Sequence, residues 1–231
     1  MSDKLFGPWI RTKPKYIFDI FEDNSSVALY PFDNSLVDYG NVHHLHVHAG
    51  INQFGSGVLS TSEISSGVVL RTAPNDYLFQ NNHYTVSFWI RGHSEMSTDN
   101  WPGIFAQGPD GPYGTQLIIN DSLELRISYG HAVTYLTGAF IVEGEWHHVI
   151  ISSDGANGAD VYYDGSAIKH LDELESNTDS NNNIGCTSIK SYYNAYYDTE
   201  YMIDADIDHF RIFNRGISSE EALALYQEKK L

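Results

Sequence analysis

Short segments in which apolar and polar residues alternate recur along most of the chain. Residues 84–91 (YTVSFWIR) place Val86, Phe88 and Ile90 on one side, and residues 123–128 (LELRIS) alternate in the same way. An alternation with a period of two is typical of β-strands that bury one face. Clusters of glycine, asparagine, aspartate and proline separate these segments and favour turns. The pattern therefore predicts an all-β protein.

A hairpin is predicted near the middle of the chain, over residues 146–164. Its two halves, residues 146–152 (WHHVIIS) and 159–164 (ADVYYD), are rich in β-branched and aromatic residues. An Asp-Gly and an Asn-Gly dipeptide lie between them and supply the positive φ angles that a tight reversal needs. The two strands are therefore expected to pair in antiparallel fashion.

Three segments resemble the laminin-G-like domains of the concanavalin A-like jelly rolls. They are the hairpin (Trp146-His147-His148-Val149, then Tyr163-Asp164-Gly165), the strand 84–91, and a closing run at residues 203–218 (IDADIDHFRIFNRGIS). Ala205 stands where the family usually has glycine. The resemblance implies an antiparallel two-sheet jelly-roll sandwich over residues 24–231, with a short C-terminal helix that Ser218 and Glu221 would cap. The basic and aromatic residues 1–23 are predicted to form an N-terminal arm.

The same resemblance implies a structural calcium ion. Residues 29–33 (LYPFD) and 38–41 (DYGN) are similar to the family's opening motif, in which an aspartate and the following turn commonly hold calcium. The predicted ligands are Asp38, Gly40, Asn41 and Asp208. Regular alternation would place Asp208 on the inward face with Phe210, where a buried carboxylate needs a partner. Carboxylate and backbone carbonyl oxygens suit calcium, and a plain Asx turn at Asp38 is the alternative.

Three alternate histidines, His44, His46 and His48, raise the question of a second metal. On a strand they would share one face, with alternate residues about 6.6 Å apart. One transition-metal ion could therefore bind an adjacent pair but not all three. A strand face exposed to solvent is the alternative.

Aromatic residues in polar segments are the candidates for ligand binding. An aromatic face offers apolar area beside a polar rim, and a sugar ring can stack on it. The candidates are Trp101, Tyr113, Tyr192, Tyr193, Tyr196 and Tyr197. The alternatives are ordinary packing within the domain or, for the four later tyrosines, a contact between subunits.

Charge and targeting signals narrow the choice of partners and location. The formal net charge of −17 repels nucleic-acid phosphates and anionic membranes, so neither nucleic-acid binding nor membrane insertion is expected. Cys186 is the single cysteine, which excludes an intrachain disulfide, and residues 1–18 have no apolar core long enough for a signal peptide. Since laminin-G-like domains usually work outside cells, a bacteriophage virion protein released by lysis is the predicted setting. A secreted extracellular protein whose leader has been removed is the alternative.

The predicted function is non-catalytic recognition or adhesion, with a glycan or a protein surface as the partner. A purely structural virion subunit, assembled through the N-terminal arm or as a homo-oligomer, is the first alternative. A jelly-roll glycoside hydrolase is the second, because Asp204, Asp206 and Asp208 alternate along one strand as catalytic carboxylates do in jelly-roll glucanases. Retaining hydrolysis requires two carboxyl groups about 5–5.5 Å apart. The run is all aspartate and belongs to the closing motif, so enzyme activity is not expected.

Overall fold

The structure is a computed structural model of the 231-residue chain. It describes residues 16–49, 53–55, 58–60, 69–73, 78, 83–93, 102–109, 115–129, 133–155, 158–172, 185–189, 191–194, 199–203 and 205–228.

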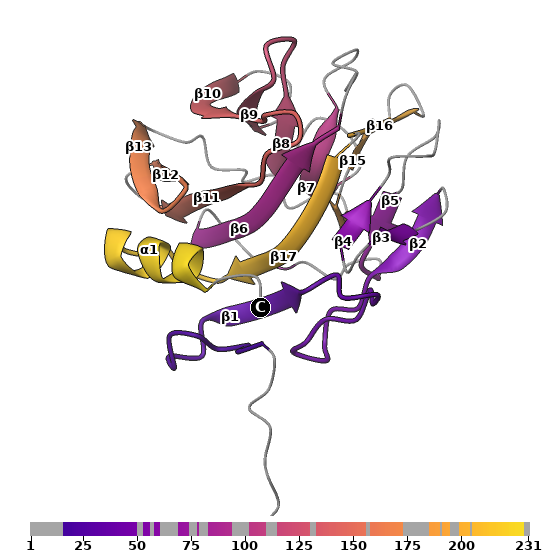
Figure 1. The fold of residues 1–231 in the computed structure, drawn as a ribbon, viewed down its shortest axis with the longest axis horizontal. Coiled ribbons are helices and arrows are strands. Elements are labelled where there is room, and N and C mark those ends of the chain that lie inside the picture. The colour runs from indigo at the N-terminus through magenta and orange to yellow at the C-terminus, as the bar shows by residue number, and fades with distance from the viewer. Residues whose placement is uncertain are drawn as a thin grey trace, which may run out of the picture.

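Two β-sheets and one helix make up the described part of the chain (Figure 1). Sheet A has the strand order β13-β12-β11-β6-β17-β4-β3, with β1 paired to β17. Its strands are β1 Ser26–Tyr30, β3 Gln53–Gly55, β4 Val58–Ser60, β6 His83–Gly92, β11 His147–Asp154, β12 Ala159–Tyr163, β13 Ser166–Leu171 and β17 Ala205–Phe213. All of its pairings are antiparallel, and they include the predicted hairpin, now seen as β11 and β12.

Sheet B has the strand order β10-β9-β8-β7-β14-β5-β2, to which a hairpin of β15 and β16 is attached. Its strands are β2 His46–Ala49, β5 Val69–Arg71, β7 Gly103–Pro109, β8 Thr115–Ile119, β9 Glu124–Tyr129, β10 Val133–Phe140, β14 Gly185–Ile189, β15 Ser191–Asn194 and β16 Thr199–Met202. Pairing is antiparallel except between β16 and β7. The predicted all-β, two-sheet sandwich is therefore confirmed.

The main core lies between the two sheets. Alternate residues of β6 enter it, as the sequence predicted, and Val86, Phe88 and Ile90 are fully buried there. Phe88 stacks on Phe210 of β17, and Phe105 of β7 packs on the same ring from sheet B. The large buried apolar area of these rings is the main force that holds the two sheets together.

A second, smaller core covers the outer face of sheet A. The helix α1 (Ser219–Gln227) lies at the end of the sandwich where β17 ends (Figure 1). Its Ala222 and Leu225 pack with Phe213 and with Ile150 of β11. No helix in the described ranges combines the length and the apolar character that a membrane crossing requires.

The predicted capping box at the start of α1 is present. The Ser218 hydroxyl accepts from the Glu221 N–H, and the Glu221 carboxylate accepts from the Ser218 N–H. Ser218→Ala should therefore lower the free energy of unfolding by about 1 kcal/mol in a urea titration. Ser166→Ala, at an exposed position of β13, is the matched control and should change it far less. Equal losses in the two variants would contradict the role of the cap.

The end of the predicted N-terminal arm packs on sheet A. Phe21 contacts the Phe213 ring at a centroid distance of 5.1 Å, and Arg211 donates to the carbonyl oxygens of Ile17 and Phe18. Residues 1–15 lie outside the described residues. The division of the chain into an arm at 1–23 and a domain at 24–231 therefore stays a prediction.

A β-bulge in β17 changes the expected alternation of the closing strand. Asp208 pairs with Trp89, but the register shifts before Arg211, and His209 has a φ of 45°. Because one extra residue fits into the strand at this point, Asp208 faces the outer side with Trp89 while Phe210 faces the core. The expectation that Asp208 and Phe210 share one face is therefore wrong.

Candidate functional site

Asp38, the first predicted calcium ligand, is fully buried and bonded to backbone. Its Oδ1 accepts from the N–H groups of Leu29 and Gly40, both at 2.9 Å. Its Oδ2 accepts from the N–H groups of Val42 and His43, both at 3.1 Å. A carboxylate has about four acceptor positions, so these four donors occupy them all. The Asp38 side chain therefore links the loop after β1 to β1 through hydrogen bonds.

Asp208, the second carboxylate of the predicted calcium site, bonds to its own strand. The side chain is 1% exposed, and its Oδ1 accepts from the backbone N–H of His209. Tyr16 joins the two regions, since its ring packs edge-on against both Tyr39 and His209. The loop after β1 and the strand β17 therefore both contact the ring of Tyr16.

Of the residues assigned to calcium, Asp38 is already occupied by backbone donors. The Asp38 carboxylate has no acceptor position left for a cation. Gly40 and Asn41 follow it in a turn in which Asn41 donates its N–H to the Asp38 carbonyl. Within the described ranges, no group of three or more histidine, cysteine, aspartate and glutamate side chains is placed to hold a metal. Calcium binding by these residues and metal binding by the histidines remain untested predictions.

The aromatic residues predicted to bind ligand are mostly outside the described residues. Trp101, Tyr113, Tyr196 and Tyr197 fall there. Tyr192 and Tyr193 lie in β15, where they pair with Tyr201 and Glu200 of β16. The structure therefore does not test these six residues as a binding surface.

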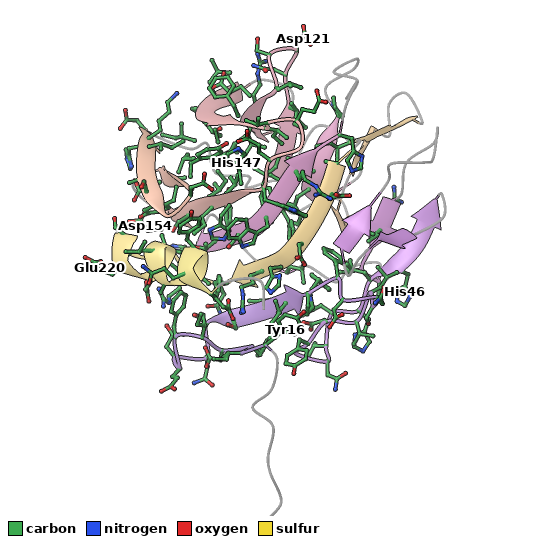
Figure 2. All side chains as sticks on the ribbon, in the orientation of Figure 1. Tyr16, His46, Asp121, His147, Asp154 and Glu220 are labelled. Atoms are coloured by element: carbon green, nitrogen blue, oxygen red, sulfur yellow. The ribbon has the colours of Figure 1, made fainter. Side chains whose placement is uncertain are left out.

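A different group of described residues, on the outer face of sheet A, has the features of a binding site. This group, the Arg91 site, comprises Arg91 near the end of β6, His93 just after β6, Trp146 just before β11, and Asp206 of β17. Arg91 pairs with Asp206 across the two strands. His147, labelled in Figure 2, is the next residue after Trp146 and marks where β11 begins.

The geometry of the Arg91 site fixes the guanidinium in one orientation. Arg91 donates from both Nε and Nη2 to Oδ2 of Asp206, with the Nε bond at 2.9 Å. His93 Nε2 lies 2.9 Å from the other carboxylate oxygen, Oδ1. The guanidinium carbon lies 5.0 Å from the centroid of the Trp146 ring, within the range of a cation–π contact. The Arg91 side chain is still 38% exposed, whereas that of Asp206 is 3% exposed.

The aspartates of the closing strand do not form a catalytic pair in the described residues. Asp206 is held by Arg91 and His93, and Asp208 is buried beside its own backbone. Asp204 lies outside the described residues. Glycoside hydrolysis requires carboxyl groups that a substrate can reach. The carboxylates of Asp206 and Asp208 do not meet this requirement.

Little in the sequence indicated the Arg91 site. Its members are distant along the chain and meet because β6, β11 and β17 are neighbours in sheet A. One signal was present: Arg91 ends an otherwise apolar strand, and Asp206 lies within another paired strand. Opposite charges within two strands expected to be buried suggest that the strands pair with each other.

The chain matches a known protein family over most of the strands that carry this site. A family model, Laminin_G_3, described as the concanavalin A-like lectin/glucanases superfamily, matches residues 64–222, which is more than half of the chain. The chain belongs to this superfamily. The matched range of this lectin/glucanase-like domain includes all four members of the Arg91 site. A search of curated proteins found no match.

Solved structures with the same fold include both enzymes and binding domains. Domain 4 of AbnA, a GH43 extracellular arabinanase from Geobacillus stearothermophilus solved with arabinotriose, has a TM-score of 0.67 and 19% identity over 88% of this chain and 98% of that domain. The sialidase of Trypanosoma rangeli with sialic acid has a TM-score of 0.61 and 15% identity over 87% of this chain and 32% of the sialidase. The binding domain of botulinum neurotoxin serotype D has a TM-score of 0.61 and 18% identity over 88% of this chain and 50% of that domain. At these identities the likeness shows the fold alone.

Proposed function

We propose that this lectin/glucanase-like domain is a non-catalytic glycan-recognition module. The observation that carries the proposal is the exposed guanidinium of Arg91, stacked on Trp146 and held in place by Asp206. A stacked aromatic ring and guanidinium offer apolar area beside hydrogen-bond donors. Sugars have apolar ring faces and a rim of hydroxyl groups, so the two surfaces are complementary in kind.

The similar structures support recognition of a sugar, although each result belongs to its own protein. AbnA domain 4, which this chain covers almost completely, was solved with arabinotriose. The matched botulinum structures are binding domains. The burial of Asp206 and Asp208, the described aspartates of the closing strand, supports binding without hydrolysis.

The proposed setting is a bacteriophage virion or the exterior of a cell, where such a module would attach to a surface glycan. The proposal rests on the resemblance to laminin-G-like domains, which usually work outside cells. The neighbouring genes test it, because capsid and tail genes beside this one would support a virion. A gene neighbourhood of secreted polysaccharide enzymes would favour the extracellular alternative.

Glycan-array binding by the full chain, followed by calorimetry on each positive glycan, tests recognition. We expect specific binding, and we expect Trp146→Ala to weaken it at least tenfold by removing the surface on which Arg91 is stacked. Tyr39→Ala, which removes an exposed aromatic ring from the loop after β1, is the matched control and should bind like the wild type.

Two outcomes would favour other functions. A folded protein that binds no glycan would support the structural-subunit alternative. In that case, light scattering should show assembly that depends on residues 1–15. Release of reducing ends from a bound polysaccharide would instead show a glycoside hydrolase and contradict the non-catalytic proposal.

A further inference from the structure

The Arg91 guanidinium has unused hydrogen-bond donors that point to a particular ligand group. An arginine carries five N–H donors, and Asp206 accepts from the one on Nε and from one on Nη2. The other three, one on Nη2 and two on Nη1, have no acceptor among the described residues. Because the side chain is partly exposed, these donors are accessible to a ligand.

The remaining donors lie along one edge of a planar group whose orientation is fixed. One N–H on Nη1 and one on Nη2 run parallel at the end of the guanidinium, and this fork matches the two oxygens of a carboxylate. Asp206 holds the adjacent edge, formed by Nε and Nη2, and Trp146 covers a face. Little side-chain freedom is therefore lost when a ligand binds, which favours affinity.

The negative charges around the Arg91 site limit how much negative charge a ligand can carry. Asp206 balances the charge of Arg91, and Glu143 and Glu145 are exposed on the segment that leads to Trp146. The chain as a whole carries −17, although charges beyond about 8 Å are largely screened at physiological salt. A single carboxylate that makes two hydrogen bonds can overcome this field, whereas a densely charged polyanion would be repelled.

We propose that the Arg91 site binds a carboxylated sugar, a uronic or a sialic acid, through two parallel hydrogen bonds from Nη1 and Nη2 of Arg91 to the sugar carboxylate. This inference rests on the proposed glycan recognition and specifies the group that is recognised. His93 supports the site indirectly, because it contacts the Asp206 oxygen that Arg91 leaves unused.

Matched acids and esters test the inference on the unmodified protein. Trigalacturonic acid and sialyllactose are each compared with their methyl esters by calorimetry at 150 mM salt, with arabinotriose as the neutral sugar. We expect at least one acid to bind at least tenfold more tightly than its own ester. The acid that shows this difference identifies the source of the carboxylate. Equal binding of each acid and its ester would overturn the proposal.

Substitution of Arg91 by lysine tests whether binding depends on the positive charge alone or on the two parallel donors of the guanidinium. Arg91→Lys keeps one positive charge but loses the fork, so it should weaken binding of the acid at least tenfold and weaken binding of the ester far less. Arg126→Lys, on β9 of sheet B, is the matched control and should bind the acid like the wild type. Wild-type affinity of Arg91→Lys for the acid would also overturn the proposal.

The outcomes for this inference and for the proposed function differ. If neutral sugars bind and the acids bind no better than their esters, the carboxylate inference fails while glycan recognition stands. If none of the acids, esters or neutral sugars binds to the folded wild type, both fail. Should Arg91→Lys not fold, the comparison of acid and ester on the wild type still decides the question.

Discussion

Replacing Asp38 with alanine is expected to lower the free energy of unfolding by at least about 3 kcal/mol. The buried carboxylate accepts four backbone N–H groups, and alanine leaves them without this acceptor. Asparagine should be nearly as destabilising, because its amide supplies an acceptor to one pair of donors and directs its own NH₂ group at the other pair. Urea unfolding followed by tryptophan fluorescence measures the difference.

Asp121→Ala is the matched control for this experiment. Asp121 is exposed in the turn between β8 and β9, far from Tyr16 and the loop after β1 (Figure 2). Its replacement should change the free energy of unfolding by no more than about 0.5 kcal/mol. A small loss in Asp38→Ala, similar to that of the control, would contradict the role assigned to the four hydrogen bonds.

A chelator separates this role of Asp38 from calcium binding. Since four backbone N–H groups occupy the acceptor positions of the Asp38 carboxylate, EDTA should leave the wild-type melting temperature unchanged. A fall in melting temperature that calcium reverses, and that Asp38→Asn lacks, would restore the calcium prediction and show that the four amides do not saturate the carboxylate.

Acidification from pH 7 to pH 5 is expected to lower the free energy of unfolding by about 2 kcal/mol through His148 alone. Burial of the ring, with a smaller contribution from the nearby charges of His209 and Arg211, lowers the pKa of His148 to about 3. The ring packs beside those of Trp89 and Tyr226, and its Nε2 is 2.9 Å from the Ser87 hydroxyl.

The direction of this effect follows from where the proton binds. In the unfolded chain His148 should have its ordinary pKa near 6.5. Between pH 6.5 and 3 the unfolded state therefore binds a proton on this ring that the folded state does not bind. The contribution to stability is therefore complete above about pH 6.5 and is lost as the pH falls towards 3. Urea titrations at pH 7 and pH 5 measure it.

Two histidine variants isolate the contribution of His148. His148→Phe keeps a flat ring beside Trp89 and Tyr226 but cannot titrate, so its pH 7 to pH 5 loss should be about 2 kcal/mol smaller than that of the wild type. His170→Gln, on the exposed strand β13, is the matched control for the loss of a histidine, and its pH 7 to pH 5 loss should exceed that of His148→Phe. If His148→Phe loses as much stability as the wild type, the buried neutral histidine is not the cause.

The sequence predicted elements well where the signal was local. The hairpin of β11 and β12, the alternation in β6 and the capping box of α1 each depend on residues that are neighbours in sequence or on one strand. These features follow from backbone preference and from the burial of one face, so a single segment carries enough information.

The predictions that failed or stayed open depend on tertiary structure. One extra residue at the β17 bulge places Asp208 on the face opposite to the expected one. No pattern in the sequence indicated the bulge. The four donors to Asp38 come partly from the loop that follows, so the sequence could not show that its carboxylate is saturated. The Arg91 site needed the order of strands in sheet A before its members could be brought together.

The position of β17 has a consequence for synthesis on the ribosome. β17 is the last strand along the described chain, yet it lies between β6 and β1 in sheet A. Until residues 205–213 leave the exit tunnel, both of those earlier strands have an open edge in the nascent chain. Unpaired edges invite pairing with other chains, so translational pauses shortly before codon 205 should raise the aggregated fraction of the product.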